Sequence, residues 1–166
     1  MQVSPIGFAL DNLEAVLAEA KRSAEVTHNH PEGIKGAQAI ASAIFLARTN
    51  ANKAELADFV TDNFGYCLDN VLEVIRPNYQ FDVTGPGTVP AALLCFLESV
   101  DFEDALRNAV SLGGDSDTLA CITGAVAQAY YSVIPSRIEQ GCLRRLVTRL
   151  REVAPEFIAT FIDRNL

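Results

Sequence analysis

The residues best suited to chemistry lie in one short segment, Gly113-Gly114-Asp115-Ser116-Asp117-Thr118. Two carboxylates and a hydroxyl follow a glycine turn at the start of an apolar, helix-like pattern. Hard oxygen atoms that converge in this way are the ligands that Mg²⁺ and Ca²⁺ prefer. A structural alternative stays open, because Asp115 could cap the helix while Asp117 complements the helix dipole. The segment is not a calcium loop, since position 120 is alanine.

The second candidate is the histidine pair in Thr27-His28-Asn29-His30-Pro31, which holds the only histidines of the chain. Such a pair could bind a metal, donate hydrogen bonds to a phosphate, or close a turn. Zinc is a poor fit, because no further nitrogen or sulfur ligands lie nearby in the sequence. Pro31 suits the first position of a helix, whose free N–H groups would favour an anion.

Other catalytic patterns are absent from the sequence. Gly85-Pro86-Gly87 lacks the later glycine of a dinucleotide fingerprint, no P-loop lysine is present, and no serine sits in a nucleophile elbow. The four cysteines have no zinc or redox spacing, so we expect them to behave as small buried apolar residues: Cys67, Cys95, Cys121 and Cys142.

The elements that must position these residues are predicted to be helices nearly throughout. Asp11, Asn52 and Asp101 stand at predicted caps, each with an acidic residue three positions later. Gly and Pro residues between positions 77 and 88 predict the one substantial loop. No alternating strand pattern is visible, so the fold class is predicted to be all-α. The expected helices cover residues 12–25, 31–48, 52–64, 68–75, 89–99, 102–112 and 116–132, with one or two more from about 143 and Pro155 in a first turn.

Length and composition limit the class of protein. A chain of 166 residues with 49% hydrophobic and 20% charged residues predicts a single globular domain over residues 1–166. Its net charge of −8, without a visible basic patch, disfavours nucleic acid as a partner. No apolar stretch is long enough to span a membrane, and the first ten residues lack the features of a signal peptide. We therefore expect a soluble, cytoplasmic protein.

Several of these segments together resemble the ADP-ribosylglycohydrolases, the family that includes the dinitrogenase-reductase-activating enzymes. The similarity runs in order through Val3-Ser4-Pro5-Ile6-Gly7, Thr27 to Ala37, Ser111 to Ala120, Gly124-Ala125 and Ile134-Pro135. It implies a compact orthogonal bundle of helices. It also implies a hydrolase that uses two Mg²⁺ ions to cleave the N- or O-glycosidic bond between ADP-ribose and an acceptor.

The resemblance assigns roles to individual residues. It makes Asp115, Asp117 and Thr118 ligands of Mg²⁺, with Asp115 and Asp117 as the catalytic carboxylates, and makes His28 a contact to ADP-ribose. In the implied mechanism the ions hold the ribose hydroxyls and orient a water while the glycosidic carbon becomes oxocarbenium-like. A carboxylate near the metals accepts the proton of that water.

The resemblance covers only the carboxy-terminal half of the family's pattern. The upstream Gly-Asp helix, the Thr-Asp-Asp or Ser-Asp-Asp motif and the glycine-rich phosphate loop have no counterpart, and Gln2 stands where arginine is usual. We therefore expect a domain truncated at its N-terminus with at most a partial, weak Mg²⁺ site. Exposed apolar helix faces would then favour a homo-oligomer or a complementing N-terminal half as partner.

Two other functions stay open. The chain could be a non-catalytic helical domain that binds ADP-ribose or a partner, or that acts only with a separately encoded first half. It could also be a purely structural scaffold. In that case Asp115 would only cap a helix, and its replacement would change stability by about 1 kcal/mol and nothing else.

Overall fold

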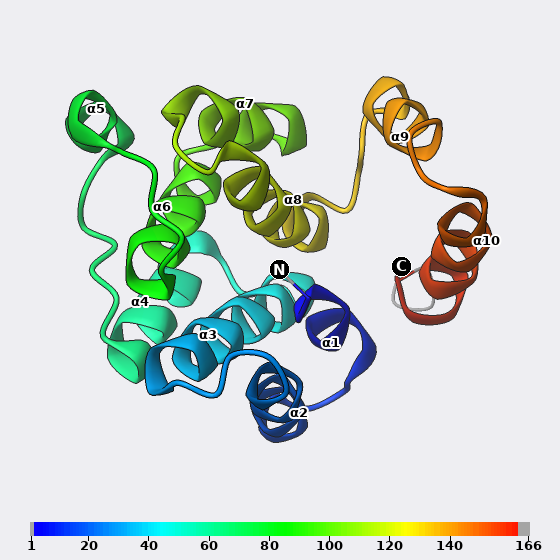
Figure 1. Ribbon diagram of the computed structural model, residues 1–166, viewed down its shortest axis with the longest axis horizontal. Coiled ribbons are helices and arrows are strands. Elements are labelled where there is room, and N and C mark those ends of the chain that lie inside the picture. Colours follow the sequence, from blue (N-terminus) through cyan, green and yellow to red (C-terminus); the bar gives the residue numbers. More distant parts are fainter. Residues whose placement is uncertain (1, 163–166) are drawn as a thin grey trace.

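The computed structural model describes residues 2–162, which fold into helices joined by short connections (Figure 1). The described residues contain no strand, which confirms the predicted all-α class. The helices are α1 Ser4–Ala9, α2 Leu13–Glu25, α3 Pro31–Arg48, α4 Lys53–Phe64, α5 Leu72–Ile75, α6 Gly85–Leu97, α7 Phe102–Leu112, α8 Ser116–Tyr131, α9 Ser136–Leu143 and α10 Thr148–Phe157, with a 3₁₀ turn at Arg76–Asn78 and a π-helical turn at Ile158–Ile162.

Helix α3 is the centre of the fold, as its small side chains predict. It packs against α1 and α2 on one side and against α6 and α8 on the other (Figure 1). Its second half is buried almost completely, through Ala39, Ile40, Ala41, Ser42, Ala43, Ile44 and Ala47. A Cβ atom on Gly7 would lie 2.6 Å from the carbonyl oxygen of Ala41, so only glycine lets α1 cross α3 this closely.

Caps fix most helix boundaries where the sequence predicts them. Asn52 and Glu55 form the expected reciprocal capping box of α4, and Asp101 accepts the backbone N–H of Asp104 at the start of α7. One predicted cap is wrong by a residue, because Asn12 rather than Asp11 accepts from Ala15 at the start of α2. Either side chain can cap a helix, so local sequence does not choose between them.

The predicted loop at residues 77–88 is too long by several positions. Helix α6 begins at Gly85 rather than Val89, because Thr84 accepts the N–H of Gly87 and proline is tolerated at position 86 in the first turn. The helix predicted over residues 68–75 is also shorter, since only Leu72–Ile75 are α-helical before the 3₁₀ turn.

The last helices differ most from expectation. Helix α9 begins at Ser136, upstream of the predicted start near 143, and Pro155 lies inside α10 rather than in its first turn. Neither helix contains a buried residue, and both lie at one side of the molecule (Figure 1). Within residues 2–162 no helix is both long and apolar enough to cross a membrane.

The expectation that all four cysteines are buried is wrong for three of them. Cys95 is buried in α6, and burial raises the pKa of its thiol to about 12. Cys67, Cys121 and Cys142 are exposed. Cys67 lies in the connection after α4, Cys121 on the outer face of α8, and Cys142 in α9, which buries nothing. The exposure of each cysteine is therefore decided by its position in the tertiary fold rather than by the general burial preference of cysteine.

Candidate functional site

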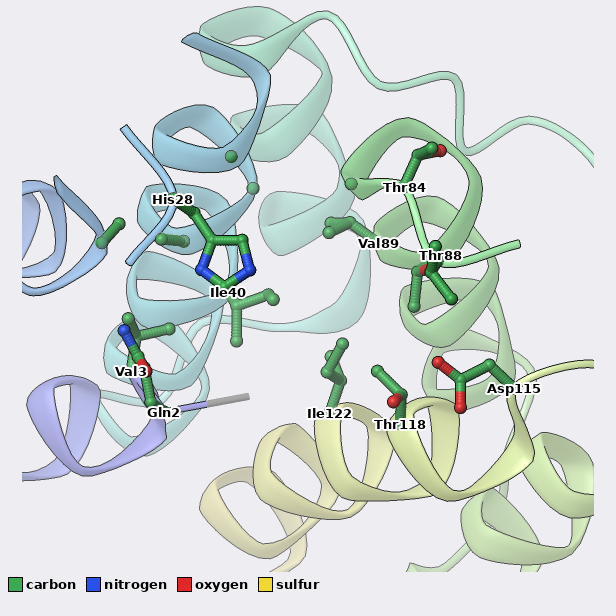
Figure 2. A pocket seen from close by; sticks show the side chains of 16 residues that line it. Gln2, Val3, His28, Ile40, Thr84, Thr88, Val89, Asp115, Thr118 and Ile122 are labelled. Atoms are coloured by element: carbon green, nitrogen blue, oxygen red, sulfur yellow. The ribbon is translucent and has the colours of Figure 1, made fainter. Parts of the chain in front are cut away.

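A cavity of about 460 Å³ lies where the first turns of α3, α6 and α8 meet (Figure 2). It brings together segments that are far apart in the sequence, including the residues around both candidate motifs. Its lining residues are Gln2, Val3, Ala24, His28, Gly33, Gly36, Ala37, Ile40, Val83, Thr84, Gly85, Thr88, Val89, Asp115, Thr118 and Ile122.

The glycine turn before α8 presents Asp115 to this cavity. Gly113 and Gly114 have φ of 84° and 61°, values that favour glycine, and a Cβ atom on Gly114 would lie 2.9 Å from the Tyr79 ring. Asp115 then occupies the N-cap position, but its side chain makes no capping hydrogen bond. Its half-buried carboxylate lies at the cavity beside Thr118, one turn further on (Figure 2).

Asp117 differs from Asp115 in its exposure and in its place relative to the cavity. Its side chain is exposed and does not line the cavity. A hydrogen bond with the Asp115 carboxyl, followed by the backbone N–H groups of Thr118 and Asp117, holds the pKa of Asp117 below its usual value. Asp115 therefore lines the cavity, and Asp117 lies outside the lining.

His28 lines the cavity on the side opposite Asp115 (Figure 2). Its Nδ1 atom lies 2.8 Å from the hydroxyl of Thr27, which in turn accepts from the amide of Gln2 at 3.2 Å. A Cβ atom on Gly33 would lie 3.0 Å from the carbonyl oxygen of His28, so glycine lets the first turn of α3 pack against this segment. His30 instead caps α3 by accepting the N–H of Glu32.

The start of α6 supplies polar groups that the sequence analysis did not single out. Thr84 and Thr88 line the cavity, and the hydroxyl of Thr88 donates to the carbonyl oxygen of Asp82 at 3.0 Å. In the sequence, Gln2 stands out only as a departure from the family pattern. The threonine before Gly85 is a recognisable N-cap and could have revealed this helix start. No local pattern places Gln2 in the cavity.

The donor set fits one side of a Mg²⁺ coordination shell. The Asp115 carboxylate and the Thr118 hydroxyl are hard oxygen ligands at the cavity wall, and the Asp117 carboxylate is adjacent. Within residues 2–162 no group of three or more His, Cys, Asp and Glu side chains is placed to hold a metal ion. His28 lies across the cavity from Asp115, so the two do not converge on one ion. The described residues would therefore supply only part of the ligands that a Mg²⁺ ion needs.

Comparison with known proteins decides the family. A family model described as ADP-ribosylglycohydrolase matches residues 1–165. The chain belongs to the ADP-ribosylglycohydrolase family. A solved relative titled "ADP-ribosylglycohydrolase-related protein complex" superposes with a TM-score of 0.73 at 30% identity, over 97% of this chain and 57% of its own length. The predicted fold of this family is thus confirmed.

Sequence relatives of this ADP-ribosylglycohydrolase family member are longer proteins. An uncharacterized protein of Archaeoglobus fulgidus is 32% identical over 92% of this chain and 57% of its own length. Human ADP-ribosylhydrolase ARH3 is 28% identical over 86% of this chain and 52% of its own length. ADP-ribosylarginine hydrolase Tri1 of Pseudomonas putida is 32% identical over 90% of this chain and 43% of its own length. The chain spans about half the length of these relatives.

Proposed function

We propose that this protein is a Mg²⁺-dependent hydrolase that binds an ADP-ribosyl group in the cavity and cleaves its N- or O-glycosidic bond. One observation carries the proposal: the cavity unites His28 with Asp115 and Thr118, although these residues come from distant parts of the sequence. Membership in the ADP-ribosylglycohydrolase family supports the same chemistry.

The size and electrostatics of the cavity support this ligand class. A volume of about 460 Å³ lies within the range of ordinary ligand pockets. No lysine or arginine is among the lining residues. The positive ends of α3, α6 and α8 therefore offer the favourable potential for a pyrophosphate, because helix N-termini attract anions.

In the proposed mechanism four side chains act on the metal ion, the attacking water or the ligand. Asp115, Thr118 and Asp117 would hold Mg²⁺, which when bound stabilises negative charge and orients the ribose hydroxyls. Asp115 is the one carboxylate among the lining residues, so it accepts the proton of the attacking water. His28, held by Thr27, contacts the ligand from the opposite wall. The apolar side chains of Ile40, Val89 and Ile122 limit access of bulk water between them.

A second candidate function is binding of ADP-ribose without turnover. It is favoured by the donor set, because the described residues place a single carboxylate on the cavity wall and form no complete metal cluster. Under this alternative, catalysis requires further acidic ligands from a complementing polypeptide segment. The two candidates share a binding step and differ only in turnover.

Calorimetric titration of Mg²⁺ together with ADP-ribose tests the shared step first. We expect Mg²⁺-dependent binding that is lost in an Asp115→Asn, Asp117→Asn double variant. Hydrolysis assays then separate the two functions. An ADP-ribosylarginine substrate comes first, because Tri1 is an ADP-ribosylarginine hydrolase, followed by an O-linked ADP-ribosyl peptide. Absence of binding in the unaltered protein would contradict both functions.

A further inference from the structure

Tyr66 carries a polar group that the fold leaves without a partner. It follows the left-handed Gly65 that ends α4, and it is only 4% exposed. Its hydroxyl oxygen is fully buried and is the one buried side-chain polar atom among the described residues that has no hydrogen-bond partner. Because buried polar groups are nearly always hydrogen-bonded, this hydroxyl requires an explanation.

The hydroxyl lies directly behind the wall of the main cavity. A Cβ atom on Gly36 would be 3.5 Å from the hydroxyl oxygen, and one on Gly85 would be 3.9 Å from it. Both glycines line the main cavity, one from α3 and one from the first turn of α6. At the seam between these helices, therefore, no side chain from either glycine separates the Tyr66 hydroxyl from the cavity.

Tyr66 itself lines a different cavity. A second hollow of about 440 Å³ is lined by Tyr66 and Lys35, among others. The Lys35 ammonium lies 4.8 Å from the centre of the Tyr66 ring and is paired with Glu32 at 2.9 Å. The ring is thus held from outside, while its hydroxyl is directed toward the seam. Tyr66 therefore lines one cavity, while its hydroxyl lies near two glycines that line the other.

The hydroxyl keeps its proton at neutral pH and can donate it in a hydrogen bond. Burial, assisted by the negative charge of Glu32, raises the pKa of Tyr66 to about 12. The proton therefore stays on the phenol throughout the physiological range. A protonated phenol that finds no acceptor in the protein is suited to an acceptor supplied from outside.

We propose that the Tyr66 hydroxyl donates a hydrogen bond to an oxygen of the ligand in the main cavity and is therefore a specificity-determining residue of that site. This inference rests on the proposed function, which supplies an oxygen-rich ADP-ribosyl ligand. Since the hydroxyl is buried, the oxygen reaches it when the first turn of α6 moves slightly away from α3. Gly36 and Gly85 place no side chain in the path of this approach.

The test compares Tyr66→Phe with Tyr131→Phe, using ADP-ribose with Mg²⁺ as the probe. Tyr131 is a matched control, because its hydroxyl donates to the carbonyl oxygen of Ser99 at 2.8 Å, away from the cavity. We expect Tyr66→Phe to weaken ADP-ribose binding about threefold to tenfold, the range for one neutral hydrogen bond, while the Tm of the free protein does not fall. Tyr131→Phe should lower the Tm and leave the Kd unchanged.

A purely structural tyrosine would behave differently. Unchanged affinity in Tyr66→Phe, while the unaltered protein binds ADP-ribose, overturns this inference and leaves the proposed function standing. Failure of the unaltered protein to bind ADP-ribose overturns the proposed function itself. The two failures are therefore distinguishable.

Gly36→Ala provides a second, independent variant. Its methyl group would lie 3.3 Å from Val89 and 3.5 Å from the Tyr66 hydroxyl, within the proposed approach. We expect it to weaken ADP-ribose binding in the unaltered background and to have no further effect in Tyr66→Phe. Fully additive losses in the double variant would show that the alanine acts by crowding the cavity, and would contradict a hydrogen bond across the seam.

Discussion

At the scale of single residues, Asp115 occupies the N-cap position of α8 but does not act as a cap. An acid at the first position before a helix commonly accepts a backbone N–H, yet the Asp115 side chain makes no such bond. The glycine turn directs its carboxylate to the cavity instead. Because the Asp115 carboxylate makes no capping hydrogen bond, its oxygen atoms can bind a ligand instead.

Alanine substitution distinguishes helix capping from ligand binding. Asp101→Ala removes a real cap, because Asp101 accepts the N–H of Asp104 at 2.8 Å, and we expect it to cost about 1 kcal/mol. Asp115→Ala should change the free energy of unfolding by less than about 0.5 kcal/mol and abolish Mg²⁺-dependent ADP-ribose binding. Urea denaturation and calorimetry measure the two effects. Equal stability losses would indicate that Asp115 is a cap.

Gly114 offers a second test at this scale, with Gly65 as its matched control. Both glycines have φ near 60°, so alanine is strained at either position. Only at Gly114 would the new Cβ also meet the Tyr79 ring at 2.9 Å, whereas nothing lies within 4 Å at Gly65. We expect Gly114→Ala to be more destabilising by about 1 kcal/mol or more and to weaken ADP-ribose binding. Equal urea midpoints would contradict this.

At the scale of elements, the site depends on where α6 begins. Asp82 accepts the backbone N–H of Thr84 at 2.7 Å, and the carbonyl oxygen of Asp82 accepts from Thr88. A Cβ atom on Gly87 would lie 2.0 Å from the Asp82 carboxylate, so the turn closes tightly on the helix start. These contacts hold the threonines that line the cavity.

The turn that contains Asp82 leads to a prediction about how stability depends on pH. Hydrogen bonds from the backbone and side chain of Thr84 hold the pKa of Asp82 below its ordinary 3.8. Its contribution to stability is therefore complete above pH 3.8 and is lost as the pH falls through the lower folded-state value. We expect Asp82→Asn to lose less stability than the unaltered protein on acidification from about pH 6 to about pH 3. Urea midpoints that fall in parallel for Asp82→Asn and the unaltered protein across this pH range would contradict a stabilising role for the Asp82 carboxylate.

At the scale of the whole molecule, α9 and α10 leave apolar side chains uncovered. Val147 is 66% exposed, and Leu150 and Val153 are each 51% exposed. Five arginines and three glutamates lie within residues 136–162, in a chain whose net charge is −8. This part of the molecule therefore differs in charge from the acidic remainder.

We propose that this surface associates with a second copy of the chain or with a complementing half, because exposed apolar patches favour association. Sedimentation should show a mass that rises with protein concentration or on addition of the complementing polypeptide. Leu150→Glu together with Val153→Glu should reduce that association without unfolding the helices, since neither side chain is buried. A monomer under all these conditions would contradict the expectation.

The sequence by itself determined most of the long helices, because their signals are local. The box of Asn52 and Glu55 and the left-handed Gly65 fix helix ends through contacts within a few residues. The alternating glycines and prolines near Gly85 led to a wrong prediction of where α6 begins, because the same residues suit both a loop and the first turn of a helix. The sequence also marked His28, Asp115 and Thr118 as candidates by residue type and by resemblance.

Only the tertiary structure decided which candidates share a cavity. It placed His28 opposite Asp115, left Asp117 exposed and outside the lining, and added Gln2, Thr84 and Thr88 to the lining, while leaving three cysteines exposed. It also buried the Tyr66 hydroxyl behind two glycines. The reason is physical: a helix forms from interactions three or four residues apart, whereas a cavity forms where helices distant in sequence fail to fill the space between them.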